Sequence, residues 1–485
     1  MSATPAAADP KSQLRHVMGF WDVLLFNIAS VLGPRWIAAA AHNGAPSLSL
    51  WVISGAIFFV PSSLVIMELS TRFPYEGGLY AWTKEAFGEF HGFVAGWTYW
   101  VYTFFYFPGL LISGAAMAAY IGGSGAAHFA QERTFLMVGS LAMLFVAVYL
   151  NLIGLNVGKW LQNAGGVATY APLVMLVGMG AYVWHLHGSA TTFTWATIRP
   201  QWNWNTVNFW PQIAFAYTGL ELCSFMSEEV RDPRKTFPPA IVGSGILIAI
   251  MYAVGTVALL AMLPAAAVDP KSGVFQALTL ASSMLRLTVF GVVAAVLVTI
   301  GNAGGVGTTV AGVARIPFVV GIDRYMPAAF SKIHPKWKTP WVSILVQAGI
   351  SGTILLLIQL NETVNSAYQI LIDAAVILYF IPFLYMFPAI IKLAYRPDRT
   401  TDKGAVLIPG GKFGAWVCGV LGFAIVLAGI VLSMIPPGEA RSVWIFELKL
   451  IGGTGISVLI GLILYARGAW QKKREARGLS PRPLA

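Results

Sequence analysis

Long apolar segments alternate with short polar or turn-forming stretches along almost the whole chain. A helix needs ~20 apolar residues to cross the ~30 Å hydrocarbon core of a bilayer. By this criterion the pattern predicts twelve spanning helices, at residues 18–41, 48–70, 93–121, 134–154, 163–186, 208–227, 239–263, 287–313, 341–359, 366–392, 413–435 and 445–467. The connection at 264–286 is long enough to hold a surface helix. We therefore expect an all-α membrane protein whose immediate partner is the lipid bilayer.

The composition supports this class and excludes several others. Hydrophobic residues make up 57% of the chain and charged residues 11%, and the mean hydropathy is +0.70, whereas soluble domains carry ~25% charged residues. Cys223 and Cys418 lie far apart in apolar segments, and the histidines near span ends lack the spacing of metal ligands. We predict no metal site, no cofactor and no enzyme activity.

The basic residues predict an orientation. With the N-terminus in the cytoplasm, most of the 31 lysine and arginine residues fall in cytoplasmic loops, as the positive-inside rule requires. The exceptions are Arg35, within a span, and Arg133, Arg199, Lys271, Arg286, Arg441 and Lys449. Both termini are therefore predicted to be cytoplasmic, in a multi-pass protein of the cell inner (plasma) membrane. The net charge of +11 then needs no nucleic acid to explain it.

The first span is interrupted in its middle. Residues 27–41 are apolar except around Gly33-Pro34-Arg35. Proline removes a helix hydrogen bond, glycine lowers helix propensity, and an arginine in hydrocarbon is costly unless it faces water or a partner. One interpretation is a kinked helix whose arginine reaches one membrane surface. The other is a substrate site.

The sixth span has a second interruption, with Thr218-Gly219 beside Glu221. The two breaks correspond if spans 1–5 and 6–10 form two halves of opposite orientation. Paired interruptions of this kind are typical of a transporter site near the bilayer midplane, where freed N–H groups bind a carboxylate and freed carbonyls bind a cation. A channel would more naturally show repeated pore-lining segments.

Span eight is rich in glycine, at Gly301, Gly304, Gly305 and Gly307. A phosphate-binding loop would need a following lysine and a preceding strand, and this segment has neither. Small residues that let two helices approach closely are the better explanation.

Several motifs resemble those of the amino acid-polyamine-organocation (APC) permeases. They are the stretch from Met67 to Trp82, with Ala86-Phe87-Gly88 and Gly96-Trp97; the stretch Phe215 to Glu221, followed by Glu229 to Lys235 and Pro238; and Ala314 to Pro317, followed by Asp323 to Pro327 and Thr339-Pro340. They occur in the family's order over residues 16–467. The chain is identified as a member of this superfamily.

The resemblance implies a LeuT-type fold, with two inverted five-helix repeats and two additional C-terminal helices. The corresponding divisions are a cytoplasmic tail at 1–16, a first repeat at 17–187, a second repeat at 188–396, spans 11 and 12 at 397–467, and a basic cytoplasmic tail at 468–485. The unwound parts of spans one and six would hold the substrate. The implied residues are Ser30, Leu32, Gly33, Pro34, Arg35, Phe215, Tyr217, Thr218, Gly219 and Glu221.

Two features distinguish this chain within the superfamily. The segments Ile408 to Lys412 and Ser433 to Pro437 are similar to the glutamate/GABA antiporter branch. Where most relatives have Gly-Ser-Gly in span one, this chain has Gly33-Pro34-Arg35, and Thr169 stands where many proton-coupled relatives have a lysine.

Each charged candidate has two interpretations. The guanidinium of Arg35 is suited to bidentate pairing with a substrate carboxylate, or it forms a structural ion pair with Glu221 or Asp373. Protonation of Glu221 would couple transport to a proton gradient, or its carboxylate is a fixed acceptor for unwound backbone. Asp373 is a secondary coupling candidate.

Other residues are candidates for closing the substrate path and for binding a coupling ion. Aromatic residues at Tyr99, Trp100 and Phe215 are predicted to close the path over the substrate. Thr308 and Thr309 would offer hydroxyl ligands to sodium, or they bond back to their own helix. The coupling ion is thus a proton or sodium. Glu68, Glu229 and Arg315 are expected to form ion pairs that close the cytoplasmic gate.

The sequence therefore predicts a secondary active transporter of a small-molecule amino acid or amine, working by alternating access. Glutamate/GABA-type exchange or proton coupling fits Arg35 and the branch resemblance. A polyamine or other organic-cation transporter is the alternative, with Glu221 and Asp373 holding ammonium groups. A different class, a transport-inactive sensor or partner subunit, has no extramembrane domain to support it. No feature of the sequence fixes an oligomeric state.

Overall fold

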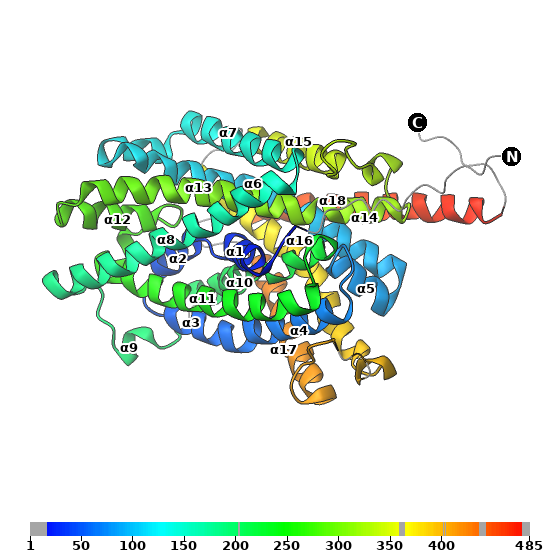
Figure 1. Ribbon diagram of the computed structural model, residues 1–485. Coiled ribbons are helices and arrows are strands. Elements are labelled where there is room, and N and C mark those ends of the chain that lie inside the picture. Colours follow the sequence, from blue (N-terminus) through cyan, green and yellow to red (C-terminus); the bar gives the residue numbers. More distant parts are fainter. Residues whose placement is uncertain are drawn as a thin grey trace.

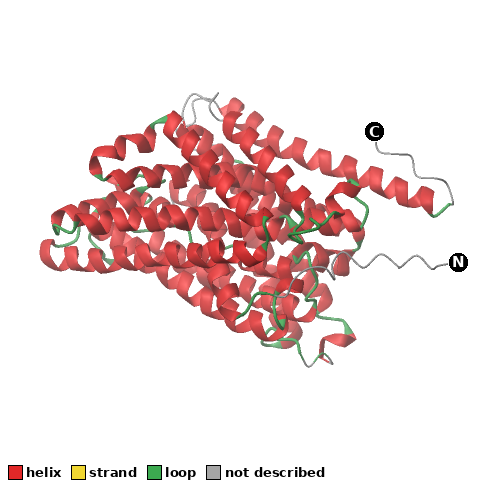
Figure 2. Ribbon diagram, turned by 45° about the horizontal axis from the view of Figure 1, so that its top comes forward, coloured by secondary structure: helices red, strands yellow, loops and turns green. Residues whose placement is uncertain are grey.

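The structure is a computed structural model that describes residues 17–201, 204–357, 364–400, 402, 404–435 and 443–477. Within these residues the regular structure is helical (Figure 2), and the β pairing is limited to an isolated bridge between Met18 and Val230. The predicted tail at 1–16 lies outside the described residues, as do Pro436 and Pro437. Residues 478–485 of the predicted C-terminal tail also lie outside them, whereas α18 continues to Glu475.

The chain forms a bundle of helices that run roughly side by side (Figure 1). The α-helices are α1 Phe20–Val31, α2 Pro34–His42, α3 Ser47–Ser54, α4 Val60–Arg72, α5 Leu79–Phe87, α6 Glu89–Ala118, α7 Arg133–Leu152, α8 Leu155–His187, α9 Trp195–Ile198, α10 Trp204–Ala216, α11 Pro233–Met262, α12 Gly273–Met284, α13 Thr288–Val313, α14 Arg315–Ile322, α15 Trp341–Leu357, α16 Val364–Leu393, α17 Gly411–Ser433 and α18 Val443–Glu475. Short 3-10 segments include η4 Ser124–Gln131, η5 Leu220–Glu229 and η7 Ala328–Ser331, and a π-helical turn, η2 Gly55–Phe59, joins α3 to α4.

Ten helical segments in the described residues are long and apolar enough to cross a membrane. They correspond to ten of the twelve predicted spans. The other two depart from the prediction for different reasons. The ninth is α15, whose described part has 17 residues, and the sixth is divided into α10 and η5, so neither half reaches a spanning length. The predicted surface helix within 264–286 is present as α12.

The interrupted first span lies at the centre of the bundle. Its halves α1 and α2 pack against α8, α11 and α13, while α6 packs against α13, α16 and α18 (Figure 1). The apolar window of the first span is 78% buried, but that of α18 is only 17% buried. The C-terminal helix α18 therefore lies at the periphery, where its apolar surface can face lipid.

Glycines let α8 and α13 approach closely. A Cβ atom added to Gly165 would lie 2.6 Å from the Cα of Gly304, and one added to Gly301 would lie 2.6 Å from Thr169 Oγ1. No side chain fits between two backbones at such distances, which confirms the interpretation of the span-eight glycines as packing residues. The close contact fixes the position of α13 relative to α8.

We expect Gly165→Ala to destabilise the protein by about 1–3 kcal/mol, because the new methyl group would meet backbone atoms that can move only together with α13. Gly178→Ala in the same helix is the matched control, since an added Cβ there has no neighbour within 4 Å. Thermal unfolding of the purified protein measures both. Equal unfolding temperatures for the two variants would contradict the close packing of α8 and α13.

Candidate functional site

The first interruption separates α1 from α2. The last helical residue of α1 is Val31, Leu32 and Gly33 have extended backbone conformations, and α2 begins at Pro34. Proline suits the first helical position, because its fixed φ fits a helix and its missing N–H would have no intrahelical partner there. The predicted break is thus present, and the N-terminus of α2 carries the positive end of a helix dipole in the centre of the bundle.

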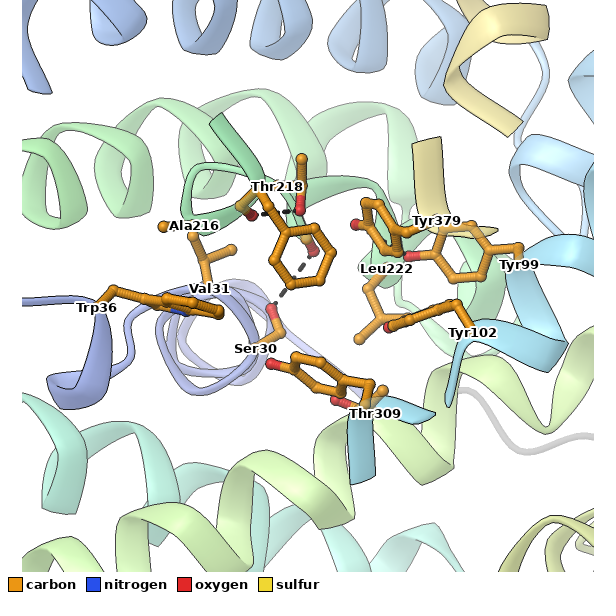
Figure 3. A pocket seen from close by; sticks show the side chains of 13 residues that line it. Ser30, Val31, Trp36, Tyr99, Tyr102, Ala216, Thr218, Leu222, Thr309 and Tyr379 are labelled. Atoms are coloured by element: carbon orange, nitrogen blue, oxygen red, sulfur yellow. Dashed lines mark hydrogen bonds between the residues drawn. The ribbon is translucent and has the colours of Figure 1, made fainter. Parts of the chain in front are cut away.

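The second interruption separates α10 from η5 and lies against the first. Gly219 has φ of +118°, a backbone conformation that other residues rarely adopt. A Cβ added there would lie 3.0 Å from the side chain of Val31 and 3.5 Å from the carbonyl oxygen of Ser30. The Ser30 hydroxyl lies 3.0 Å from the carbonyl of Asn27 and 3.4 Å from that of Gly219, which links the two breaks (Figure 3).

The hydroxyl of Tyr252 on α11 contacts backbone groups at both breaks. Its hydroxyl oxygen lies 2.6 Å from the carbonyl of Val31 and 3.0 Å from the carbonyl of Ala216, and it accepts a hydrogen bond of 3.3 Å from the N–H of Gly33. The ring is stacked on Trp51, with centroids 4.3 Å apart. One fixed hydroxyl thus satisfies backbone groups that the breaks of both helices expose.

Glu221 is fully buried beside the second break. Its Oε1 accepts hydrogen bonds from the hydroxyls of Tyr99, at 2.5 Å, and Tyr379, and its Oε2 accepts one of 3.1 Å from the N–H of Gly219. The carboxylate is therefore bound to unwound backbone, as one of the two interpretations of this residue predicts. It also connects η5 to α6 and α16.

Arg35, the second residue of α2, is buried among aromatic rings. Its Nη2 donates a hydrogen bond of 2.8 Å to the hydroxyl of Tyr106, and its guanidinium carbon lies 4.5 Å from the centroid of the Trp36 ring and 5.0 Å from that of Tyr106. Aromatic faces stabilise a cation that has left water. Because the α2 N-terminus is itself positive, the arginine adds to a local potential that favours an anion.

A small cavity lies between the two breaks, with Trp36 on one side and Tyr99, Tyr102 and Tyr379 on the other (Figure 3). It is also lined by Ser30, Val31, Tyr106, Phe215, Ala216, Thr218, Gly219, Leu222 and Thr309. The volume is about 20 Å³, which is enough for roughly one water molecule. The Phe215 ring contacts Trp36, Tyr106 and Tyr379, with centroids 5.7, 5.9 and 5.2 Å apart. Aromatic rings close the site in this conformation.

A second cavity of about 20 Å³ lies behind the first break and contains Leu32, Gly33, Pro34 and Arg35 in its wall. Both cavities share Ser30, Val31, Trp36 and Tyr106. The structure therefore brings most of the sequence-predicted substrate residues to the two breaks.

Other predicted residues lie elsewhere. The Tyr217 hydroxyl donates to the carbonyl of Trp51 in α3. Trp100 packs against Trp97, Phe104 and Phe330, away from both cavities. A helix turns by about 100° per residue, so Tyr99 and Trp100 face different neighbours.

The residues predicted to couple transport to an ion differ in their burial and hydrogen bonding. Thr309 lines the first cavity, and its hydroxyl donates to the carbonyl of Gly305 in its own helix. Thr308 is fully buried, and its hydroxyl has no hydrogen-bond partner among the described residues. Asp373 is buried in α16. The described residues contain no cluster of histidine, cysteine and carboxylate side chains that could hold a metal ion.

Sequence reasoning missed Trp36, Tyr102, Tyr106, Tyr252 and Tyr379. A signal for two of them was present, because Tyr99, Tyr102 and Tyr106 follow the spacing of one helix face. Tyr252 and Tyr379 had no comparable signal, since each reaches the site from a helix distant in the sequence.

Ion pairs connect several segments at one end of the bundle, here called the basic end. It comprises residues 68–89, 227–235, 315–340, 396–400, 402 and 404–408, which carry many lysine and arginine residues. Glu68 is fully buried and accepts hydrogen bonds from Arg399, at 2.8 Å to each carboxylate oxygen, and from Arg72 at 3.2 Å. Arg315 pairs with Glu229 at 2.7 Å. The structure confirms that Glu229 and Arg315 pair, whereas Glu68 belongs to a separate group.

Glu76 lies in the same region, between α4 and α5, with an oxygen 3.8 Å from Arg315 Nε. Burial is the main cause that raises the pKa of Glu76 well above its usual range; Glu229 adds to this rise, and Arg315 opposes it. A carboxyl whose pKa is raised by folding contributes stability that is complete below its unfolded pKa and is lost as the pH rises through its folded pKa.

We expect Tyr252→Phe to lower the free energy of unfolding by about 1–3 kcal/mol, because backbone groups at both breaks lose their buried partner. Tyr182→Phe, at a tyrosine that is 53% exposed, is the control. Thermal unfolding in detergent compares the two variants. If both unfold at the wild-type temperature, the hydroxyl of Tyr252 does not stabilise the breaks.

We expect Glu76→Gln, which resembles the protonated side chain, to reduce the loss of stability that the wild type shows as the pH rises above the unfolded pKa of about 4.3. The measurement is the unfolding temperature between pH 4 and pH 8. Glu132→Gln, at an exposed position on the opposite end of the bundle, is the control. A pH profile of the Glu76 variant that is parallel to the wild type would contradict the raised pKa.

Comparisons with known proteins identify the family. Residues 18–453 match the family described as amino acid permease. An uncharacterized transporter of Legionella pneumophila is 27% identical over 92% of this chain and 96% of its own length. The serine/threonine exchanger SteT of Bacillus subtilis is 26% identical over 71% of this chain and 77% of its own length. The probable agmatine/putrescine antiporter AguD of Lactococcus lactis is 23% identical over 93% and 95%.

The family match covers most of the chain, and it is accompanied by apolar helices that are long enough to span a bilayer. The resemblance to the APC superfamily is thereby confirmed. The chain is a multi-pass membrane protein that belongs to the amino acid permease family of the APC superfamily.

Proposed function

We propose that this protein is a secondary active transporter of amino acids that works by alternating access in the cell membrane, with twelve spans arranged as two inverted repeats of five and two additional helices. The observation that carries the proposal is the meeting of two interrupted helices around a small cavity, with Ser30 against Gly219. Freed backbone groups at such breaks bind the charged ends of a substrate. Transport then requires only that the two halves of each broken helix move separately.

The carboxylate of the substrate binds at the N-terminus of α2. Arg35 and the positive end of the helix dipole both favour an anion there. The guanidinium of Arg35 offers several N–H donors, and its bond to the Tyr106 hydroxyl can be exchanged for a bond to the ligand. An acidic or zwitterionic amino acid, such as glutamate or a GABA-like compound, satisfies this preference.

Glu221 is the proposed proton-coupling group. Its carboxylate accepts a bond from the Gly219 N–H and bonds from Tyr99 and Tyr379. Protonation removes the charge and one acceptor position, which weakens this connection between η5, α6 and α16. The break in span six thereby becomes sensitive to the proton gradient. Sodium at Thr308 and Thr309 is the alternative source of coupling.

Substrate entry requires an aromatic gate to open. The cavity of about 20 Å³ is far below the ~300 Å³ at which ligand pockets begin. Phe215, whose ring contacts Trp36, Tyr106 and Tyr379, is the proposed central element of that gate. The ion pairs of Glu68 and Arg315 close the basic end, which we propose to be cytoplasmic together with both termini.

An organic amine is the second candidate substrate. It is supported by the similarity to a probable agmatine/putrescine antiporter and by the tyrosines that line the cavity, since aromatic faces and a buried carboxylate bind ammonium groups. In that case Glu221, with Asp373, receives the amine, and Arg35 disfavours it.

We expect an acidic or zwitterionic amino acid to raise the unfolding temperature of the wild type, because a ligand that binds only the folded state stabilises it. The screen covers amino acids and polyamines at acidic and neutral pH, with and without sodium. Arg35→Ala should abolish the shift and Arg35→Lys should reduce it, since lysine keeps the charge but lacks the planar fork. Arg199→Ala, at an exposed arginine away from the cavities, should leave the shift unchanged.

Uptake and exchange of the stabilising compounds in proteoliposomes then test transport itself. A shift caused by polyamines and retained in Arg35→Ala would replace the amino acid by an organic amine. Failure of amino acids and amines alike to be accumulated or exchanged would falsify the transporter proposal.

A further inference from the structure

A large apolar cavity lies along α6, away from the proposed substrate site. Its volume is about 330 Å³, more than ten times that of the cavity between the breaks. The walls come from four segments: α6 with Trp97 and Trp100, the loop after α14 with Phe330, α15 with Ile354, and α18 with Ile460 and Leu464. No residue lines both cavities.

Two tryptophans in the wall of this cavity differ in their hydrogen bonding. The indole Nε1–H of Trp97 donates a bond of 2.8 Å to the carbonyl of Ser457 on α18. Trp100 is 3% exposed, and its Nε1 has no hydrogen-bond partner among the described residues. A buried indole N–H usually finds a partner. The Trp100 nitrogen is enclosed by protein atoms, so the ring surface of Trp100 and not its N–H group forms part of the cavity wall.

The surroundings of the cavity indicate where that molecule comes from. Leu356 on α15 and Ile463 on α18 are 50% and 58% exposed, and α18 is the least buried of the spanning segments in the described residues. The neighbouring medium is therefore bilayer hydrocarbon. Protein interiors are closely packed, and a void of this size would lose many dispersion contacts unless the bilayer filled it.

We propose that this cavity binds one acyl chain of a bilayer phospholipid. The volume lies within the range of about 300–1,000 Å³ of ligand sites, and a largely apolar wall suits a hydrocarbon chain. Met326 and Pro327 in the wall belong to the basic end. The phosphate of the lipid would therefore lie beside the lysine and arginine residues of that end, which attract an anion.

The site has a consequence for α6. Tyr99, which binds Glu221, and Trp100, which lines the lipid cavity, are consecutive residues of this helix. A bound chain supports α6 from the side opposite to the breaks. The proposal itself concerns binding and does not depend on the identity of the transported substrate.

The test is the amount of phospholipid that remains bound after extensive washing of the full-length protein in detergent, measured by native mass spectrometry and by lipid extraction. We expect the wild type to retain one phospholipid per chain. Ile354→Trp, which fills the cavity, should lose most of it, and Leu356→Trp, at an exposed position two residues away on α15, should retain it. Ile460→Phe fills the cavity from α18 and serves if the first variant does not fold.

Equal retention by the cavity-filling variants and Leu356→Trp, or no retained phospholipid in the wild type, would overturn the proposal.

Discussion

A backbone N–H or C=O group inside a bilayer must find its hydrogen-bond partner within the protein, because hydrocarbon offers none. The two interrupted helices impose this demand most strongly. Tyr252 meets it at Val31, Gly33 and Ala216, and Glu221 meets it at Gly219. These partners come from separate elements, so the breaks depend on the packing of α11, α6 and α16 around them. The same contacts therefore determine both the stability of the bundle and the geometry of the candidate site.

This dependence explains why charged and polar residues are retained in the centre of an apolar bundle. Glu221 stabilises unwound backbone, and it is also placed where a proton could change the connection between helices. Arg35 packs between aromatic rings at the start of α2, where its charge adds to the helix dipole. Such residues hold the break open and remain able to exchange one partner for another. The partners of each charge are already arranged around it, but the cavity of about 20 Å³ has to enlarge before a ligand can enter.

The aromatic residues divide α6 into two faces with different neighbours. Tyr99, Tyr102 and Tyr106 lie toward the breaks, and Trp97 and Trp100 lie toward α15 and α18. The prediction of a gate from Tyr99 and Trp100 together used their aromatic character and not the helical rotation between them. Consecutive residues of a helix point about 100° apart, and here Tyr99 lines the small cavity whereas Trp100 does not. The structure thus brings Tyr99 to the candidate site and Trp100 to an apolar cavity.

The sequence by itself determined the membrane class, most of the spans, both helix breaks and the family, because these depend on local properties: apolar length, Gly-Pro interruptions and contiguous motifs. It could not find Tyr252 and Tyr379 as partners of the breaks. Only the tertiary structure decided which distant side chains meet, such as Tyr379 with Glu221 across 158 positions. Those contacts arise from the packing of whole helices. The local sequence does not determine which neighbouring helix each helix face contacts.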